Sequence, residues 1–532
     1  MQDPLPLLPY QLIVECKHRG KRMKVADSTG AKLSGHDLLL RTLILRRLLL
    51  RHVLKTGEQN VGILLPPSVP ATITNFALSF AGKTSVNLNY TANSVILNQC
   101  IALAGIKHVL TSRKVMEKLS LQLDAELVYL EDFKDKVSLV DKLSGFVGSR
   151  FIPAGLLSRQ LGVSKLKADD PLTIIFTSGS TGTPKGVVLS YTNVAANVYG
   201  IQDALSLRED DVMIGILPFF HSFGYTITLW TSQALSLAGV FHYSPLDARQ
   251  IGKLAAEHKG TILLGTPTFL RTYIRRVELE QFKTLEMVIV GAEKLPQALS
   301  DAFEKQFGIR PIEGYGSTEM SPLVSVNLPP KRSKATDATR GLREGSVGRP
   351  IPGVEARVVS LDDGTILPPG QTGMLHVRGL NMMQGYIGRK DLTDQVIQNG
   401  WYITGDIAKL DEDGFIHITG RQSRFSKIGG EMIPHIQIEE TIQAVLGSDS
   451  DGMMSAVVTA VPDEKRGERL VVLHTQLSMT PGEILKKLSE AGLPNLYLPS
   501  EDSFVQVDAI PVLGTGKLDL KAMQQLALDK LP

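Results

Sequence analysis

The chain has 532 residues, of which 43% are hydrophobic and 21% are charged, and its formal net charge is +3. Single hydrophobic cores stop growing near ~250–300 residues, so this length predicts more than one domain. The slight net charge gives no reason to expect a nucleic-acid partner. The two cysteines, Cys16 and Cys100, offer neither a metal-ligand spacing nor a disulfide framework, which favours a reducing, cytoplasmic setting.

Residues 38–51 are the most membrane-like segment, rich in leucine but interrupted by arginines. The arginines leave it short of the ~18–20 apolar residues that a membrane span needs. Two interpretations remain for a basic amphipathic helix here: peripheral contact with the inner face of an anionic membrane, or packing on the domain with the arginines in water. We favour the packed helix. The first residues, acidic and proline-rich after Met1, do not resemble a secretory signal.

Short apolar runs alternate with longer helical patterns through the first part of the chain, and they predict buried strands at 61–65, 214–217, 261–264 and 287–290. Continuous apolar strands separated by helices indicate parallel α/β layers. Between residues 346 and 420, short strands with Gly and Pro turns predict a small β-rich subdomain. The expected fold is therefore α/β: a large N-terminal domain over residues 1–420, followed by a small α+β domain over residues 421–532.

Residues 177–186 read Thr-Ser-Gly-Ser-Thr-Gly-Thr-Pro-Lys-Gly between two apolar, strand-like segments. Glycines let the backbone approach a ligand closely, while the hydroxyls, the loop amides and Lys185 can neutralise oxyanions. The Walker loop ends in Gly-Lys-Ser/Thr and leads into a helix, whereas Gly186 and an expected strand follow here. A flexible surface turn is the alternative to a polyphosphate loop. The predicted phosphate-binding residues are Thr177, Ser178, Gly179, Ser180, Thr181, Gly182 and Lys185.

This loop resembles the signature of the adenylate-forming, AMP-binding superfamily, which includes acyl-CoA synthetases, peptide-synthetase adenylation domains and firefly luciferase. Other segments are similar to the family's motifs and lie in the family's order: Tyr-Gly-Ser-Thr-Glu at 315–319, Trp-Tyr-Ile-Thr-Gly-Asp at 401–406, Gly-Arg at 420–421 and Gly-Thr-Gly-Lys at 514–517. The resemblance implies an enzyme that joins a carboxylate to the α-phosphate of ATP, with ATP and Mg²⁺ as cofactors. It also implies that the C-terminal domain is mobile.

The resemblance implies nucleotide contacts for the matched residues. Glu319 would coordinate Mg²⁺, which prefers oxygen ligands, and Thr318 would donate to phosphate. Asp406 would accept from both ribose hydroxyls, and Arg421 would contact ribose or phosphate. The adenine would stack on Tyr315. The pocket around it would be lined by Gly291, Ala292 and Gly316.

Further matched residues would act on the acyl group. Lys517 matches the lysine that reaches from the C-terminal domain to the carboxylate and α-phosphate, where a cation stabilises developing charge. Lys427 matches a lysine that faces the site during thioester formation. Ser423 departs from the Asp or Lys of many relatives, but a hinge needs a permissive backbone more than one side chain. His221 lies in the aromatic segment 218–224 and is expected to position the acyl carboxylate or to gate the acyl pocket. The alternative is that His221 has only a structural role.

The apolar surroundings of His221 favour a medium- or long-chain fatty acid as substrate. Segments 381–386 and 427–433 most resemble the synthetase half of bacterial acyltransferase/acyl-carrier-protein synthetases. The acyltransferase spacing His-x₄-Asp, from His242 to Asp247, is interpreted as coincidence.

The acceptor thiol is predicted to belong to an acyl carrier protein rather than to CoA. Glu431 would disfavour the 3′-phosphate of CoA, whereas Arg421, Arg424 and Lys427 could supply part of a basic patch for an acidic carrier protein. A fatty acyl-CoA synthetase is the alternative. A third hypothesis is a non-catalytic nucleotide- or lipid-binding protein of the same fold. The joint retention of the matched site residues argues against it.

Overall fold

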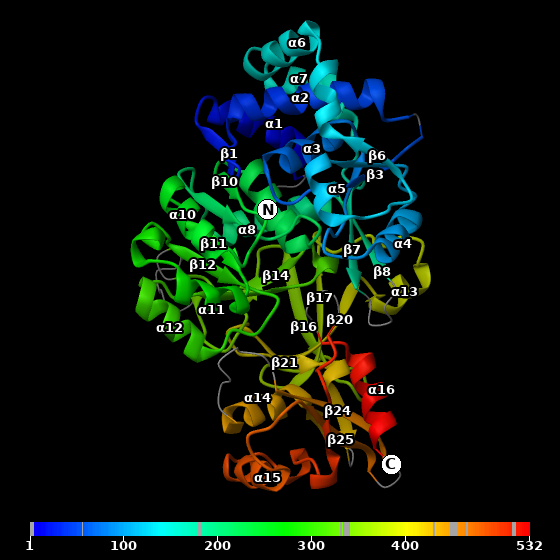
Figure 1. The fold of residues 1–532 in the computed structure, drawn as a ribbon, viewed down its shortest axis with the longest axis vertical. Coiled ribbons are helices and arrows are strands. Elements are labelled where there is room, and N and C mark those ends of the chain that lie inside the picture. Colours follow the sequence, from blue (N-terminus) through cyan, green and yellow to red (C-terminus); the bar gives the residue numbers. More distant parts are fainter. Residues whose placement is uncertain are drawn as a thin grey trace.

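The computed structural model describes residues 5–55, 57–178, 184–329, 332, 341–428, 431–446, 455–463, 466–512 and 518–531, apart from the side chains of Ser178, Ser423, Lys427 and Met432. A large N-terminal α/β domain makes up most of the molecule, and a small C-terminal α+β domain lies at one end of its long axis (Figure 1). The expected fold class is confirmed. The boundary after residue 420 stays a prediction.

A seven-stranded sheet carries the predicted phosphate loop near one edge. Its strand order is β18–β8–β7–β4–β3–β5–β6. The strands from β7 to β6 run parallel, whereas β8 and β18 are antiparallel to their neighbours. The predicted strand at 61–65 corresponds to β3. The strands are β3 (Asn60–Ile63), β4 (Thr84–Asn87), β5 (His108–Thr111), β6 (Glu126–Tyr129), β7 (Pro171–Ser178), β8 (Pro184–Ser190) and β18 (Gly385–Tyr386).

A nine-stranded sheet forms the second layer, with the order β15–β14–β13–β12–β11–β9–β10–β1–β2. Its central strands are parallel and fully buried, as their continuous apolar runs predict. The predicted strands at 214–217, 261–264 and 287–290 correspond to β9, β11 and β12. The strands are β1 (Met23–Asp27), β2 (Lys32–Ser34), β9 (Val212–Gly215), β10 (Ala238–Phe241), β11 (Ile262–Gly265), β12 (Met287–Val290), β13 (Ile312–Gly316), β14 (Leu323–Val326) and β15 (Arg349–Pro350).

Several helices of the N-terminal domain begin at side-chain caps. Ser190 and Asn193 form a capping box at the start of α8. Asp247 caps α10 by accepting from the Gln250 amide, which accounts for this aspartate without acyltransferase chemistry. The helices are α1 (Leu8–Arg19), α2 (Gly35–His52), α3 (Val69–Phe80), α4 (Ser94–Ala104), α5 (Arg113–Leu119), α6 (Leu139–Arg150), α7 (Ala154–Leu161), α8 (Tyr191–Leu205), α9 (Ser232–Ala234), α10 (Ala248–His258), α11 (Pro267–Arg276), α12 (Gln297–Phe307), α13 (Lys390–Val396) and the π-helix η3 (Phe223–Thr231).

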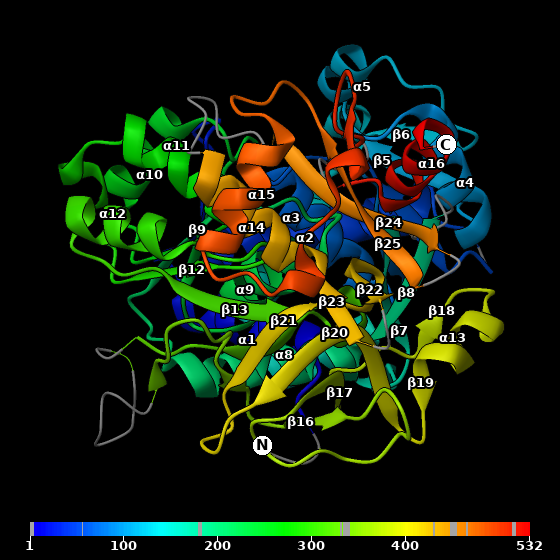
Figure 2. The same cartoon turned by 90° about the horizontal axis from the view of Figure 1, so that it is seen from below.

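A β-rich subdomain and the C-terminal domain complete the chain, and each has its own apolar core. The expected β-rich segment forms an antiparallel sheet of β16 (Val354–Val359), β17 (Thr372–Gly379), β19 (Ile397–Gln398), β20 (Trp401–Leu410) and β21 (Ile416–Arg421). Figure 2, seen from the C-terminal domain, shows its helices in front of the N-terminal sheets. This domain contains β22 (Phe425–Ile428), β23 (Glu431–Pro434), β24 (Ala456–Asp463), β25 (Gly467–His474), β26 (Phe504–Gln506), α14 (His435–Leu446), α15 (Pro481–Glu490) and α16 (Leu520–Lys530).

The leucine- and arginine-rich segment 38–51 lies within α2, which packs against α1, α3 and α6. The favoured packed helix is therefore observed, but its arginines are not simply in water. Arg46 donates to the carbonyls of Phe80 and Leu161, at 2.8 and 2.7 Å. Among the described residues, no helix is both long enough and apolar enough to cross a membrane.

Candidate active site

The two ends of the predicted phosphate loop are held together by a hairpin of β7 and β8. Thr177 pairs with Lys185 across this hairpin, so the lysine stands directly opposite the first hydroxyl residue of the motif. The strand expected after Lys185 is β8. Gly179, Ser180, Thr181 and Gly182 lie outside the described residues, and the side chain of Ser178 is not described, so their phosphate contacts stay predictions.

Asp406 is held between two donors from different elements. The Tyr315 hydroxyl donates to one carboxylate oxygen, and the Arg421 Nε donates to the other at 2.8 Å. Arg421 lies opposite Asp406 in the register of β20 and β21, and the carboxylate raises the pKa of this guanidinium. Burial and the same carboxylate raise the pKa of Tyr315 well above its ordinary value, so the phenol stays protonated. The structure therefore brings together three of the predicted nucleotide residues.

The Asp406 carboxylate is also suited to a ribose. Its side chain is only 5% exposed, whereas that of Arg421 is 63% exposed, so Arg421 covers it from the solvent side. Each carboxylate oxygen has a further lone pair beyond the bond that it already accepts. Ribose hydroxyls could thus donate to Asp406 without first breaking both existing bonds.

Glu319 lies in a 3-10 turn, Thr318–Met320, directly after β13. Its carboxylate accepts from the Tyr386 hydroxyl at 2.8 Å, and the Lys185 ammonium lies 5.5 Å from the centre of the Tyr386 ring. Burial, together with the Glu319 carboxylate, raises the pKa of Tyr386, which keeps the phenol a donor. Tyr386 thus connects the predicted metal ligand with the lysine of the phosphate loop.

Buried amides fix the chain that follows Glu319. The side-chain nitrogens of Asn197 and Asn381 both donate to the Met320 and Leu323 carbonyls. Thr318 is 7% exposed, and its hydroxyl lies 3.2 Å from that of Ser222 at the start of η3. The position of the Tyr315–Glu319 motif is therefore determined by helix α8, by residue 381 and by η3.

Sequence reasoning missed Tyr386 and Ser222 as parts of this site. Residues 381–386 stand out in the sequence only by their resemblance to one group of relatives, and no spacing rule joins positions 319 and 386. In the structure, the π-helix η3 marks this region, because π-helical turns are rare in proteins and often lie at functional sites. Its sequence, however, does not distinguish it from an ordinary apolar helix.

His221 lies in the turn that leads into η3 and is exposed. Its ring Nδ1 accepts from the Phe223 amide at 3.3 Å, and its carbonyl accepts from the Tyr225 amide at 2.8 Å. The neighbouring Phe220 packs edge-on against Tyr90, with ring centres 4.9 Å apart. The aromatic surroundings that were expected are present, and the role of His221 toward a carboxylate stays a prediction.

The turn at Gly291 and Ala292 lies next to the end of β13. A Cβ on Gly291 would stand 3.2 Å from the Gly314 carbonyl oxygen, and Ala292 has a φ of +67°. Glu293 accepts from the Thr268 hydroxyl at 2.7 Å, and Lys294 forms an ion pair with Glu440 of the C-terminal domain at 2.7 Å. The Glu293 and Lys294 side chains are thus engaged by protein groups, and no nucleotide role is needed to explain them.

The C-terminal candidates are only partly described. Lys517 lies outside the described residues, and the described residues on either side of its segment, Val512 and Leu518, form a β-bridge. Lys427 pairs with Met432 across the β22–β23 hairpin, although its side chain is not described. Their roles stay predictions.

Arg424 was wrongly assigned to a basic surface patch. It is 6% exposed, forms an ion pair with the buried Glu439 and donates to the Val458 carbonyl at 3.3 Å. This buried pair joins the turn just before β22 to α14 and is not available to a partner. The sequence showed the charge of Arg424 but not its partner 15 residues further along the chain.

A family model described as "AMP-binding enzyme" matches residues 14–387. The chain belongs to this family. The match includes the phosphate-loop hairpin, the Tyr315–Glu319 motif and Tyr386. It confirms the resemblance to the adenylate-forming superfamily.

Several proteins are similar to this AMP-binding enzyme over most of its length. A long-chain-fatty-acid–CoA ligase from Escherichia coli is 27% identical over 512 residues, covering 90% of this chain and 87% of that protein. A 3-methylmercaptopropionyl-CoA ligase from Ruegeria pomeroyi is 31% identical, covering 68% of this chain and 66% of that protein. The crystal structure of ATP-bound MatB from Rhodopseudomonas palustris superimposes with a TM-score of 0.79 at 24% identity, covering 98% of this chain and all of that one.

The residues around Glu319 fit a Mg²⁺ ion that is shared with substrate phosphates. Among the described residues, no group of three or more His, Cys, Asp or Glu side chains could hold a metal. Mg²⁺ is usually held by one or two carboxylates together with phosphates and waters, rather than by a cage of protein ligands. One carboxylate, fixed by Tyr386 near the phosphate loop, matches this mode of binding.

Gly316 allows the backbones on either side of the Tyr315–Glu319 motif to approach closely. A Cβ at this position would stand 2.0 Å from the Pro322 carbonyl oxygen, so we expect Gly316→Ala to displace β13 from β14. Such overpacking costs about 1–3 kcal/mol of unfolding free energy. Thermal unfolding is expected to show this loss, together with weaker ATP binding. Gly155→Ala, in open space on α7, is the matched control and should not lower stability.

Proposed function

We propose that this AMP-binding enzyme is an acid–thiol ligase that activates a medium- or long-chain fatty acid with ATP and transfers the acyl group to CoA. The activation step is supported above all by one observation: the predicted nucleotide residues Tyr315, Asp406 and Arg421 form one hydrogen-bonded cluster. The buried and largely apolar residues of η3, which follows His221, support an apolar acid.

In the first step, a carboxylate oxygen of the acid attacks the α-phosphorus of ATP, the bond to the bridging oxygen breaks, and pyrophosphate leaves. Asp406 would hold the ribose and the phosphate-loop hairpin would hold the leaving phosphates in line. Lys517 would stabilise the charge that develops on the α-phosphate. Mg²⁺, held by Glu319, would supply further neutralisation of the phosphates.

In the second step, the acceptor thiolate attacks the acyl carbon and AMP leaves with the bonding electron pair. We propose that the domain over residues 421–532 turns between the two steps, so that Lys517 leaves the site and Lys427 enters it. The exposed ion pair between Lys294 and Glu440 is compatible with such a turn, because exposed pairs of this kind contribute only about 0–1 kcal/mol.

We place CoA ahead of the carrier protein as acceptor, which reverses the order that the sequence suggested. Two observations support this reversal. The relatives reported above are named as CoA ligases. The basic patch that was expected to receive an acidic carrier protein loses Arg424, which is buried against Glu439. Glu431 is exposed, and this feature still favours the carrier protein as second candidate.

The acceptor can be decided by kinetics with the purified enzyme. Pyrophosphate release across a panel of acids would first identify the preferred chain length. Thioester formation is then measured with CoA and with holo acyl carrier protein at saturating acid and ATP. We expect a clearly higher kcat/KM for CoA. A higher value for the carrier protein would reverse the assignment, and pyrophosphate release without either thioester would refute both.

A further inference from the structure

Helix α6, the turn that follows it and the start of α7 expose a dense group of large apolar side chains. Seven of the 20 exposed large hydrophobic residues in the described part of the chain fall within residues 139–156. Leu139 is 82% exposed, Phe151 69% and Leu143 65%. We call this group the α6 apolar face; its members are Leu139, Val140, Leu143, Phe146, Val147, Phe151 and Leu156.

The opposite side of α6 is fixed to the protein, so the apolar face cannot turn inward. Asp141 has a fully buried side chain that accepts from Arg47 and Arg51 at 2.9 and 2.8 Å. On the same side, a Cβ on Gly145 would stand 2.8 Å from the Leu40 side chain, which shows how closely α6 packs on α2. Monomeric proteins rarely leave large apolar patches exposed, and such patches mark interaction sites.

The chain segments on either side of the α6 apolar face are rich in basic residues. Between residues 134 and 167 the chain carries seven basic and two acidic residues, a net charge of +5, and one of the acids is the buried Asp141. The Arg150 guanidinium lies over the Phe146 ring, 4.5 Å from its centre, and donates to Asp37 at 2.9 Å, so it borders the apolar group as part of an ion pair. The basic residues are Lys134, Lys136, Lys142, Arg150, Arg159, Lys165 and Lys167.

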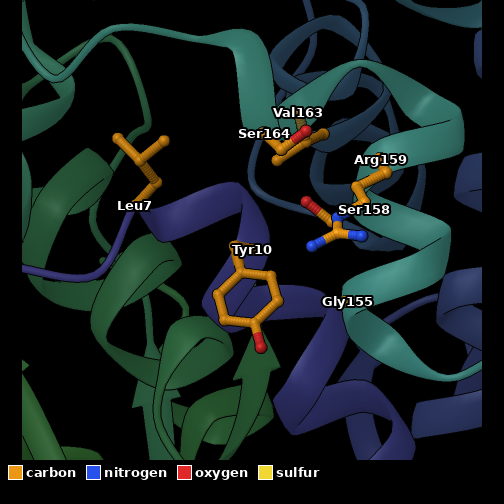
Figure 3. Close-up of a pocket in the computed structure, with 7 residues that line it drawn as sticks. All are labelled: Leu7, Tyr10, Gly155, Ser158, Arg159, Val163 and Ser164. Carbon is orange, nitrogen blue, oxygen red and sulfur yellow. The ribbon is translucent and has the colours of Figure 1, made fainter.

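A cavity of about 280 Å³ between α1 and α7 adds polar donors next to this region. Figure 3 shows the guanidinium of Arg159 pointing toward Tyr10, with the hydroxyls of Ser158 and Ser164 nearby. Arg159 is three residues beyond the exposed Leu156 on α7, so the two side chains lie on neighbouring parts of one helix surface. The donors of the cavity therefore lie close to the edge of the apolar face.

We propose that the α6 apolar face docks on a lipid bilayer that contains anionic lipids. Apolar side chains on an interfacial helix enter the boundary of the acyl chains, while the surrounding lysines and arginines meet negative headgroups. A second copy of the chain is a poorer occupant, because two such faces would bring like charges together. Figure 1 shows α6 at the end of the molecule farthest from the C-terminal domain, so docking here leaves that domain clear of the membrane.

The proposal is tested by sedimentation with vesicles of phosphatidylcholine, with and without phosphatidylglycerol, in the absence of substrate. The full chain is expected to bind the anionic vesicles and to be released by salt. The double variant Leu143→Glu/Phe151→Glu should lower the partition coefficient by roughly tenfold or more. The control Leu279→Glu/Leu361→Glu changes two side chains that are also exposed, at 55% and 41%, and should bind like the unchanged chain. Absence of binding, or equal loss in both double variants, would overturn the proposal.

A tryptophan in the face gives an independent readout of depth. The native Trp230 and Trp401 are buried, at 0% and 9% exposure, so Phe151→Trp adds the exposed reporter. Its emission should shift to the blue, and brominated acyl chains should quench it, only with anionic vesicles.

Light scattering and titration with holo carrier protein test the other occupants. The lipid assignment would be refuted if the chain forms a dimer or a complex with carrier protein, and if Leu143→Glu abolishes that association while vesicle binding persists.

Discussion

Replacing Lys517 with alanine is expected to slow acyl-adenylate formation by roughly 10²–10³-fold, the largest effect predicted for a single side chain. The ammonium would neutralise charge that develops as the carboxylate attacks the α-phosphorus. Val512 and Leu518 form a β-bridge through their backbones, and this contact does not depend on the Lys517 side chain. Pyrophosphate release measured with saturating acid and ATP checks the first half-reaction.

The second half-reaction distinguishes a chemical role of Lys517 from a structural one. Thioester formation from supplied acyl-AMP should be largely unchanged in Lys517→Ala, because the proposed turn of the C-terminal domain has by then moved the lysine away. Lys521→Ala, an exposed lysine on α16, is the matched control and should leave both half-reactions intact. Equal losses in the two half-reactions of Lys517→Ala would indicate a structural residue.

The sequence predicted the layered fold well where local chemistry decides it. The run Met287–Val290 is apolar throughout and bounded by polar turns, and it coincides with β12. The strand predicted at 61–65 is displaced by one residue at its start and two at its end from β3. Boundaries of this kind depend on where a neighbouring strand ends its hydrogen bonds, which no local pattern contains.

Long-range pairings were the part that the sequence could not provide. The contact between Glu319 and Tyr386 joins positions 67 residues apart, and it depends on how β18 is added to the edge of β8. The burial of Arg424 depends on Glu439 in a helix that packs only after folding. Helix α6 shows a different failure of local patterns. Apolar residues at helical spacing usually predict a buried face, whereas the apolar residues on the outer side of α6 are exposed.

Glu319→Gln tests the predicted metal ligand and its partner Tyr386 together. The substitution removes the charge but keeps an oxygen that can accept from the Tyr386 hydroxyl, so the fold should be retained. We expect kcat/KM for ATP at limiting Mg²⁺ to fall by at least roughly tenfold, equivalent to about 1.4 kcal/mol, because a neutral amide binds the cation less well. Raising the Mg²⁺ concentration should recover part of the activity.

Tyr386→Phe separates the orientation of the carboxylate from its charge. This variant leaves Glu319 ionised but removes the hydroxyl that fixes it at 2.8 Å, while the ring below Lys185 remains. A hydrogen bond to a charged group contributes about 1.5–3 kcal/mol, so the variant should lose activity at all Mg²⁺ concentrations. Its half-saturating Mg²⁺ concentration should change less than that of Glu319→Gln, because the ligand charge is intact. If Glu319→Gln shows no change in its Mg²⁺ dependence, Glu319 is not the metal ligand, and the assignments of Thr318 and Tyr315 in the same motif would lose their support.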